Sequence, residues 1–315
     1  MIFVKNIAEL IKDDFLIAGG KGASLGEMLR MGFPVPPGFV ILSTAFDKFL
    51  IETDIIVEID AQLKKVDVKK TNTINDASEV IRQLMNSCEV PRVLEREIFS
   101  AFSALKIKYA AVRSSAIAED SSAASWAGEL ESYLGIQKKD LICYIKQCWS
   151  SLFAPRAIFY RLWRKMKNKE NSVAVIVQNL VNAEVAGVCF TTHPVTQDRD
   201  QLVIEAGWGL GESVVSGKIT PDTYIVDKSR MEILDVNRNR QFKQVAKAGS
   251  QIQEILVPKL KIGRQCLSDK KILQIAKIAS KIEWHYGFPC DIEWALEKGK
   301  FYIVQSRPIT TLGFK

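Results

Sequence analysis

The sequence predicts an α+β fold of two lobes, because helical and strand patterns dominate different halves of the chain. The first half carries apolar residues at helical spacing, for example over residues 138–165. From about Ser172 the pattern changes to short apolar strands, beginning with SVAVIVQNLV. At 315 residues the chain is too long for one small compact domain. We therefore expect an N-terminal lobe over residues 1–171, a C-terminal lobe over residues 172–315 and a ligand cleft between them.

Composition is that of a globular protein and indicates the cytoplasm. The chain is 47% hydrophobic, and no apolar run approaches the roughly 20 residues that span a bilayer. Acidic residues close to the N-terminus and the lack of a small-residue cleavage site argue against a secretory signal. Six cysteines without a CxxC pair and only two histidines indicate reducing conditions and no zinc or haem site. The net charge of +7 is spread widely, so we expect no nucleic-acid partner.

A glycine-rich turn precedes an early helix. Gly19-Gly20-Lys21-Gly22 runs into apolar residues on one helical face, and Gly32 with the prolines after it ends that helix. Glycines let a backbone approach a ligand closely, and a helix N-terminus favours anions. The GxxxxGK[ST] pattern of a P-loop is absent. From these residues alone, Lys21 fits a phosphate contact and a plain turn equally well.

Two further segments combine charge with a strand end or with glycine. Arg113 ends the apolar strand KYAAVRSSA, where a position facing a cleft and one on the surface are equally consistent. A small polar loop is expected after it. The run EAGWGLGESVVSG holds four glycines and two acids directly after a strand, so it either approaches a ligand or simply turns.

Near the C-terminus, Ser268 and Gly287 mark the expected start and end of a long helix.

The segment DIEWALEKGKFYIVQSRPIT predicts a closing hairpin. Alternation puts Asp291 and Glu293 on one face of its first strand, and Gln305 and Arg307 on one face of the second. If Glu293 lies opposite Gln305, a three-residue loop at Lys298-Gly299-Lys300 joins the strands. The same register places Asp291 opposite Arg307. A two-residue turn shifts the register by one, so this arrangement requires an odd loop or a bulge.

Two interpretations of this hairpin stay open at the level of the residues. A carboxylate beside an amide oxygen suits Mg²⁺, which binds through few protein ligands together with phosphate oxygens. Arg307 offers paired donors that fit a phosphate. Alternatively, Asp291 and Arg307 form a structural cross-strand pair, and Glu293 and Gln305 lie at a solvated edge.

Four segments, taken in this order, resemble a known family. They are GGKGASLGEMLRMGFPVPPGFVI, AVRSSAIAED with SWAGELESYLG, GVCFTTHPVT with VIEAGWGLGESVVSGKITPDTYIVDK, and DIEWALEKGKFYIVQSRPITTL. From about residue 5 to residue 312, the chain resembles the ATP-binding domain of the phosphoenolpyruvate synthase, pyruvate phosphate dikinase and rifampin phosphotransferase family. The stretch from WGLGE to PDTYIVDK is more similar to the synthase and rifampin phosphotransferase branch than to the dikinase branch.

The resemblance implies an ATP-grasp-like fold that binds ATP between its two lobes. Lys21, Arg113 and Arg307 match the family's phosphate-binding cations, which neutralise charge as a phosphoryl group leaves. Glu293 and Gln305 match its Mg²⁺ ligands. The complete set that matches nucleotide or phosphate contacts is Lys21, Arg113, Gln178, Leu180, Asp291, Glu293, Gln305 and Arg307, of which Gln178 and Leu180 match the hinge around the adenine.

The chain departs from the family pattern in a loop thought to cover the phosphates. Family members of this branch usually have Thr-Ala-Glu-Asp and Phe-Ala-Gly-Gln, where this chain has Ile117-Ala118-Glu119-Asp120 and Trp126-Ala127-Gly128-Glu129. A carboxylate at Glu129 near a triphosphate is repulsive unless a metal or a lysine compensates. These departures bear on turnover more than on ATP binding.

A second departure concerns the histidine that accepts the phosphoryl group in the family. Full-length relatives carry it on a swivelling domain, and neither His193 nor His285 lies in such a motif. We therefore expect an ATP-dependent phosphotransferase component that uses Mg²⁺, passes a phosphoryl or pyrophosphoryl group to a histidine in trans or on a missing domain, and yields AMP and phosphate.

Several identities remain open for such a component. It is a truncated domain of a synthase, or the ATP-binding subunit of a split enzyme of the phenylphosphate synthase or antibiotic phosphotransferase type. A catalytically idle nucleotide-sensing module is the alternative from another class. The final acceptor, whether pyruvate, a phenol or an antibiotic, is not encoded in these residues.

Overall fold

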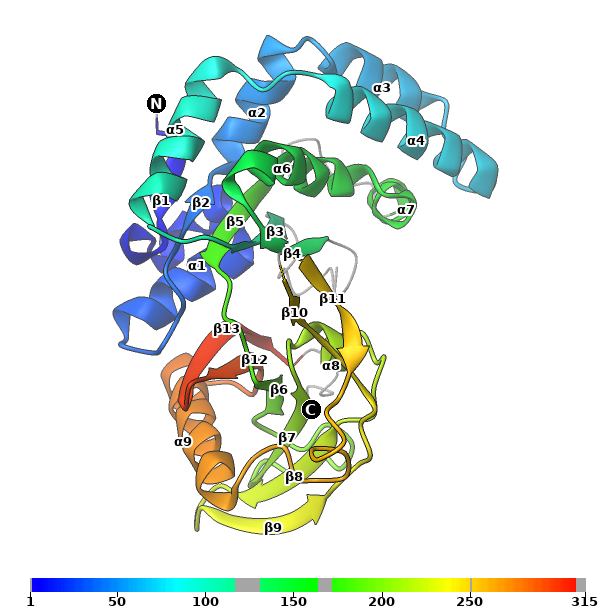
Figure 1. The fold of residues 1–315 in the computed structure, drawn as a ribbon. Helices are drawn as coiled ribbons and strands as arrows, with labels where there is room; N and C mark the ends of the chain where they lie inside the picture. Colours follow the sequence, from blue (N-terminus) through cyan, green and yellow to red (C-terminus); the bar gives the residue numbers. More distant parts are fainter. Residues whose placement is uncertain (1, 117–130, 164–171, 250, 310–315) are drawn as a thin grey trace. The chain divides into compact units, whose positions relative to one another are not determined.

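The chain forms two compact units, both of which combine helices with antiparallel sheet (Figure 1). A computed structural model describes residues 2–116, 131–163, 172–249 and 251–309. The first unit comprises Met1–Glu27 with Pro37–Leu180, and the second comprises Met28–Pro36 with Val181–Lys315. Mixed helix and sheet agrees with the predicted class. The first unit extends beyond the boundary expected at residue 171, because β5 (Val173–Asn179) is the middle strand of its sheet.

A five-stranded sheet in the order β1-β2-β5-β3-β4 is the centre of the first unit. Its other strands are β1 (Val4–Asn6), β2 (Gly38–Ile41), β3 (Ala110–Ala116) and β4 (Ser132–Ile136), and all neighbours pair antiparallel. Every residue of β3 is buried, as are the first six of β5. Because both faces of these strands are covered, most of their side chains are apolar or small, with Arg113 in β3 and Gln178 in β5 as exceptions.

Helices build the rest of the first unit. They are α1 (Phe15–Arg30, whose last residues belong to the second unit), α2 (Ser43–Glu52), α3 (Ile56–Lys64), α4 (Thr71–Ser87), α5 (Arg92–Ala104), α6 (Leu141–Ser150) and α7 (Pro155–Trp163). Short 3-10 turns precede or join them at η1 (Ile7–Glu9), η2 (Lys12–Asp14), η3 (Lys138–Asp140) and η4 (Ser151–Phe153). The helix or helix pair expected over residues 138–165 is therefore a pair, α6 and α7, joined through η4.

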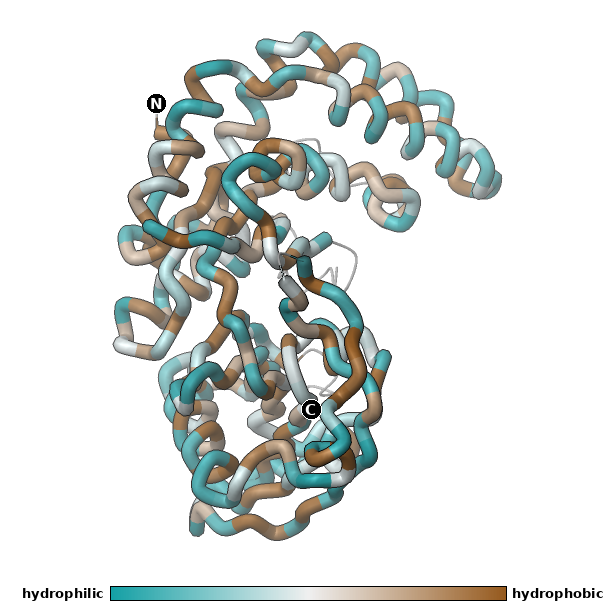
Figure 2. Tube along the Cα trace, in the orientation of Figure 1, coloured by the Kyte–Doolittle hydropathy of each residue, from teal (hydrophilic) through white to brown (hydrophobic). Residues whose placement is uncertain are grey.

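Amphipathic packing holds these helices together: α2, α5 and α6 contact the sheet, and α3, α4 and α7 pack on other helices. Brown and teal residues alternate along α3 and α4 in Figure 2, as expected for helices with one apolar face. Trp149 of α6 is fully buried, with its ring 5.0 Å from that of Phe49 and 6.0 Å from that of Phe46 on α2. Such aromatic pairs contribute about 0.5–1.5 kcal/mol each beyond the burial of their area. This cluster fixes α2 and α6 on the same core.

The second unit contains a six-stranded antiparallel sheet in the order β13-β12-β6-β7-β8-β9. The strands are β6 (Val185–Phe190), β7 (Gln201–Trp208), β8 (Asp222–Asp227), β9 (Glu232–Asn237), β12 (Cys290–Glu297) and β13 (Lys300–Pro308). A separate two-stranded sheet pairs β10 (Lys243–Ala248) with β11 (Gln251–Leu256), and α8 (Glu212–Val215) follows β7.

Helix α9 (Asp269–Tyr286) packs against this sheet with a stripe of buried apolar residues. It begins after Ser268 and ends at Gly287, whose φ of 75° is left-handed, so both predicted ends are confirmed. Trp294 and Phe301 of the closing hairpin add an edge-on aromatic contact at 5.5 Å. Within the described residues, no helix combines the length and apolarity needed to cross a membrane.

Candidate functional site

The glycine-rich turn of the first unit lies directly on the end of strand β3. Gly19 has φ 70° and ψ 167°, a conformation that divides α1 into two helical pieces. A Cβ atom on Gly19 would lie 2.3 Å from Ser115 Oγ and 2.4 Å from the Ser115 carbonyl oxygen. Both the dihedral angles and the close approach therefore require glycine.

Hydrogen bonds fix Lys21 beside the second half of β3. Arg113 is the middle residue of that strand and pairs with Ile176 of β5, so the prediction that Arg113 ends the strand is wrong. Ser115 Oγ donates to the Ala18 carbonyl at 2.9 Å and accepts the Gly22 N–H at 3.2 Å. The Lys21 ammonium lies 3.4 Å from the carbonyl oxygen of Ser114, the residue that follows Arg113. Two cations that are far apart in sequence thus come from adjoining backbone segments of one unit.

Gln178 and Leu180 lie at the end of β5 in the same unit. Gln178 is buried and stands opposite Gly38 of β2 and Ala111 of β3. The Leu180 N–H donates to the Tyr109 carbonyl at 3.1 Å. Leu180 is also the last residue of the first unit before the chain enters the second. The residues predicted to contact the adenine therefore lie in a segment whose backbone is held by hydrogen bonds, directly before the chain enters the second unit.

The closing hairpin has the predicted register, reached in a different way. Glu293 stands opposite Gln305 and Asp291 opposite Arg307, which confirms both pairings. The predicted three-residue loop is wrong, because Lys300 pairs with Glu297 and only two residues form the turn. Those two, Lys298 and Gly299, both have positive φ, as a tight I′-type turn requires.

A bulge in β13 compensates for the short turn, which confirms the predicted alternative to an odd loop. The register shifts by one between Glu293 and Trp294, because Trp294 stands opposite Ile303 and Glu293 opposite Gln305. Val304 is the additional residue on the β13 side. Without it, Gln305 would point to the opposite face of the sheet, since successive side chains alternate. The bulge is therefore the feature that brings an amide and a carboxylate side by side.

Arg307 and Asp291 form an ion pair next to this carboxylate and amide. Arg307 Nε and Nη2 donate to the same Asp291 oxygen at 2.9 and 2.7 Å. Burial raises the pKa of Asp291, the charge of Arg307 opposes that shift, and Glu293 adds to it. The structural pair expected on one interpretation is present. Gln305, however, is only 6% exposed, so it does not lie at the solvated edge that this interpretation also assumed.

Glu205 of β7 is a further carboxylate on this face that the sequence did not identify as a site residue. The register continues from Glu293 to Val188 of β6, and from Val188 to Glu205. Residues that pair in this way project on the same face, so Glu293 and Glu205 flank Val188. Burial raises the pKa of Glu205, and the charge of Asp291 adds to that. The sequence did carry a signal for this residue, because Glu205 is an acid within the apolar run QLVIEAG.

The donor set at the hairpin fits Mg²⁺ in chemistry. Glu293 and Gln305 supply hard carboxylate and amide oxygens from adjacent strands. Within the part of the chain that the structure describes, no three His, Cys, Asp or Glu residues are grouped to hold a metal ion. Asp291, Glu293 and Glu205 therefore form no ready-made carboxylate cage. A small number of protein ligands completed by phosphate oxygens is the usual way in which Mg²⁺ accompanies a nucleotide.

The glycine-rich run after β7 packs against the protein's own backbone. A Cβ atom on Gly209, which has φ 81°, would lie 2.3 Å from the Val245 carbonyl oxygen. The Leu210 N–H donates to that same carbonyl at 2.7 Å, and the Trp208 N–H donates to Gln241 Oε1 at 3.0 Å. The sequence left open whether this glycine-rich run approaches a ligand or simply turns. At Gly209, the turn and its contact with Val245 are sufficient to explain the glycine.

A buried network around Asp222 holds the segments that support this run. Its carboxylate accepts the Tyr224 hydroxyl at 2.9 Å, the Cys266 N–H at 2.8 Å and the Asn239 N–H at 2.9 Å. Gln241 joins it through an amide contact of 3.4 Å to Asp222. The PDTY part of the motif therefore has a structural role, which is to join β8 to the segments before β10 and α9.

Some other predicted features do not contribute to the described site. The loop expected to cover the phosphates, including Ile117 and Glu129, lies outside the described residues. His193 accepts the N–H groups of Val195 and Thr196 through its Nδ1 atom, at 3.3 and 3.2 Å. That histidine therefore organises its own loop.

Comparison with known proteins identifies the class of this chain. A family model described as "Pyruvate phosphate dikinase, AMP/ATP-binding domain" matches residues 16–315. The chain therefore belongs to this family of ATP-binding domains, as the four motifs had indicated.

Three relatives that match almost the whole chain are named as phosphoenolpyruvate synthases. The chain is 46% identical, over 99% of its length, to a probable phosphoenolpyruvate synthase of Methanocaldococcus jannaschii. It is 42% identical over 99% to a probable phosphoenolpyruvate synthase of Methanothermobacter thermautotrophicus, and 39% identical over 98% to a phosphoenolpyruvate synthase of Pyrococcus furiosus. It covers only 27%, 46% and 44% of these three relatives.

Proposed function

We propose that this chain is the Mg-ATP-binding component of a phosphotransferase of the phosphoenolpyruvate synthase type, with an ATP-grasp-like fold. The observation that carries the proposal is the register of the closing hairpin, which sets Glu293 beside Gln305 and Asp291 beside Arg307. The bulge gives Gln305 this register, because the turn of the hairpin has only two residues. The family of ATP-binding domains to which the chain belongs supports the same conclusion.

Each group of residues has a distinct role in this proposal. Lys21 and Arg113 bind the phosphates from the first unit, and Arg307, oriented by Asp291, adds paired donors from the second. Glu293 and Gln305 hold Mg²⁺, which when bound neutralises charge on the phosphate oxygens. Gln178 and the backbone near Leu180 contact the adenine.

The acceptor in this proposal is a histidine outside the described chain. Transfer of a pyrophosphoryl group to that nucleophile releases AMP, and hydrolysis of its outer phosphate then gives free phosphate and a phosphorylated histidine. Transfer of a phosphoryl group alone would release ADP instead. The named synthases extend well beyond the segment that the chain matches, which leaves room for a histidine-bearing domain in that kind of protein.

Titration calorimetry with Mg-ATP tests the binding part directly. We expect the native chain to bind, and Glu293→Gln to weaken binding at least about tenfold, because one charged metal ligand is worth more than 1.4 kcal/mol. Glu297→Gln is the matched control, since Glu297 lies on the same strand but pairs with Lys300 at the turn. An unchanged affinity in Glu293→Gln, or equal losses in both variants, contradicts the assignment.

Product analysis tests the transfer part. Native chain, Mg-ATP and a histidine-bearing partner protein should give AMP and a phosphorylated partner, and omission of the partner should leave ATP intact. A chain that binds Mg-ATP but gives no AMP with any histidine-bearing partner would instead be a nucleotide sensor.

A further inference from the structure

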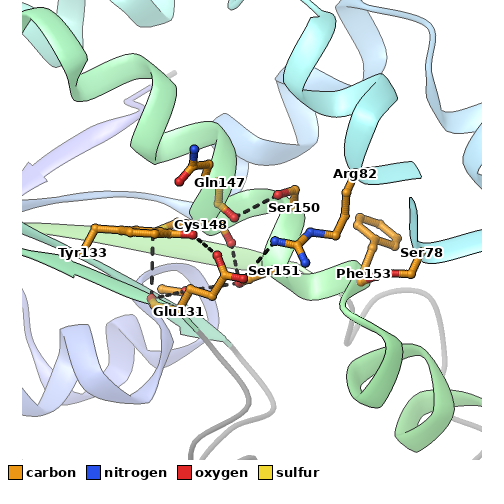
Figure 3. A network of polar contacts seen from close by, with 10 residues as sticks. Ser78, Arg82, Glu131, Tyr133, Gln147, Cys148, Ser150, Ser151 and Phe153 are labelled. Atoms are coloured by element: carbon orange, nitrogen blue, oxygen red, sulfur yellow. Dashed lines mark hydrogen bonds and ion pairs between the residues drawn. The ribbon is translucent and has the colours of Figure 1, made fainter. Parts of the chain in front are cut away.

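A polar network connects helix α4 to Ser114 of β3, the residue after Arg113, and Figure 3 shows its α4 side. Ser114, which is fully buried, is the meeting point. Its N–H and its hydroxyl both donate to the Glu131 carbonyl oxygen, at 3.2 and 2.8 Å. On the other side, its own carbonyl accepts the Lys21 ammonium at 3.4 Å. Glu131 therefore helps to hold Ser114 in place, and the Ser114 carbonyl in turn helps to hold Lys21.

The Glu131 side chain uses both carboxylate oxygens. One accepts Arg82 Nη2 of α4 at 2.9 Å, and the other accepts the Tyr133 hydroxyl (Figure 3). The Arg82 and Glu131 side chains are about one-third exposed, at 32% and 31%. Ion pairs that are exposed to this degree contribute little to the stability of a fold. Stability alone is thus a weak explanation for an arrangement with two donors on one carboxylate.

A second route runs from the same helix to the same serine. Ser78 lies four residues before Arg82, so both project from one face of α4. The Ser78 hydroxyl donates to the Phe153 carbonyl at 2.7 Å, which holds the turn η4. Ser151 in that turn places its hydroxyl oxygen 3.3 Å from Ser114 Oγ. Helix α4 therefore reaches Ser114 through Arg82 and Glu131 on one side, and through Ser78 and η4 on the other.

We propose that Arg82 and Glu131 are positioning residues that hold Ser114, and through it Lys21 and Arg113, in the arrangement that binds the nucleotide phosphates. They act on the backbone of β3 and on the lysine that contacts it, without touching the nucleotide. The inference rests on the proposed function, because it assigns Lys21 and Arg113 to ATP phosphates. It adds α4 to the parts of the first unit on which ATP affinity depends.

Arg82→Met and Glu131→Gln remove the ion pair while keeping side-chain size. The matched control is Lys146→Met, which also removes a cation that anchors α4. Lys146 Nζ donates to the carbonyls of Asn86 and Cys88 at 2.6 and 2.9 Å, at the C-terminal end of α4 and beyond Arg82. Arg82→Lys retains the charge and serves as the conservative variant.

Two readouts separate positioning from a general loss of structure. The Ser114 N–H donates to the main-chain carbonyl of Glu131, and the Glu131 side-chain contacts hold that carbonyl in place. Hydrogen exchange of the Ser114 amide should therefore accelerate in Arg82→Met and Glu131→Gln. Mg-ATP affinity, measured by calorimetry, should fall about fivefold or more in each, as expected for coupled sites. The double variant should bind no more weakly than either single one, because both break the same link. Arg82→Lys should recover part of the affinity, and Lys146→Met should bind like the native chain.

The outcomes for this inference and for the proposed function are distinguishable. Native affinity and native Ser114 exchange in Arg82→Met overturn the positioning role and leave Mg-ATP binding intact. An equal loss in Lys146→Met overturns it as well, because the effect would then follow from α4 packing in general. Failure of the unaltered chain to bind Mg-ATP overturns the proposed function, and with it the role assigned here.

Discussion

The two parts of the proposed site are built by opposite means. The Lys21–Arg113 corner depends on contacts between segments far apart in sequence, with Gly19 pressed against Ser115. The hairpin of the second unit sets its four polar residues by local pairing, a two-residue turn and one bulge. The Lys21–Arg113 corner should therefore be destabilised by any added group that pushes its two segments apart. A hairpin of the second kind is sensitive to register and charge.

The largest effect is expected at the corner, from Gly19→Ala. The added methyl meets backbone at 2.4 Å, and φ 70° with ψ 167° is strained for any residue but glycine. We expect the free energy of unfolding to fall by about 3 kcal/mol in urea denaturation. Gly32→Ala is the control, because Gly32 has φ 81° but nothing within 4 Å of its Cβ position. It should cost about 1 kcal/mol. Equal losses in both would mean that the approach to Ser115 does not matter.

A smaller effect is expected in the hairpin from Asp291→Asn. The change removes the charge that Arg307 pairs with at 2.7 and 2.9 Å, on a side chain that is only 12% exposed. Removing the charged acceptor of Arg307 should lower stability by about 1.5 kcal/mol, a loss larger than the gain from relieving the burial that raises the pKa of Asp291. Glu254→Gln removes the partner of Lys243 in an exposed pair and should change stability less. Thermal unfolding of the two variants compares them, and a greater loss in Glu254→Gln contradicts the account.

The smallest effect concerns the pH dependence of the hairpin face. The pKa of Glu205 lies above its ordinary 4.5 because of burial first and Asp291 second. The folded state then binds this proton more tightly than the unfolded chain does. Its contribution is complete below pH 4.5 and is lost as pH rises through the raised value.

Glu205→Gln should therefore flatten the fall in stability between pH 4.5 and pH 7. The difference should be about 0.5 kcal/mol or less, because the side chain is partly exposed and screened. Denaturation of the native chain and the variant at both pH values measures it. A steeper fall in the variant would mean that Glu205 is not repelled by its neighbours.

The same contrast explains what could be predicted from the sequence. Period-two alternation predicted the pairs Glu293–Gln305 and Asp291–Arg307, because side chains of a hairpin follow strict local geometry. Alternation did not distinguish a three-residue loop from a two-residue turn with a bulge, since both give the same register. The bulge at Val304 has no marker such as glycine in this strand.

Features that depend on contacts between distant segments were harder to predict from the sequence. Gly19 was recognisable as a glycine-rich turn, but its contact with Ser115 depends on packing that no local pattern specifies. Glu205 escaped notice as a site residue because its position beside Glu293 follows only from the strand order β12-β6-β7. The placement of β5 in the first unit is likewise a matter of sheet order, and it moved the boundary from residue 171 to Leu180.

The most direct test of the central claim compares ATP affinity with and without Mg²⁺ in two variants, Lys21→Met and Glu293→Gln. If the hairpin holds the metal and the corner holds the phosphates, Lys21→Met should bind more weakly in both conditions but still gain affinity from Mg²⁺. Glu293→Gln should lose most of that gain, while its affinity without Mg²⁺ stays at the native level or rises, because a repelling carboxylate is gone. A full Mg²⁺ gain in Glu293→Gln, or its loss in Lys21→Met alone, would contradict the division of roles.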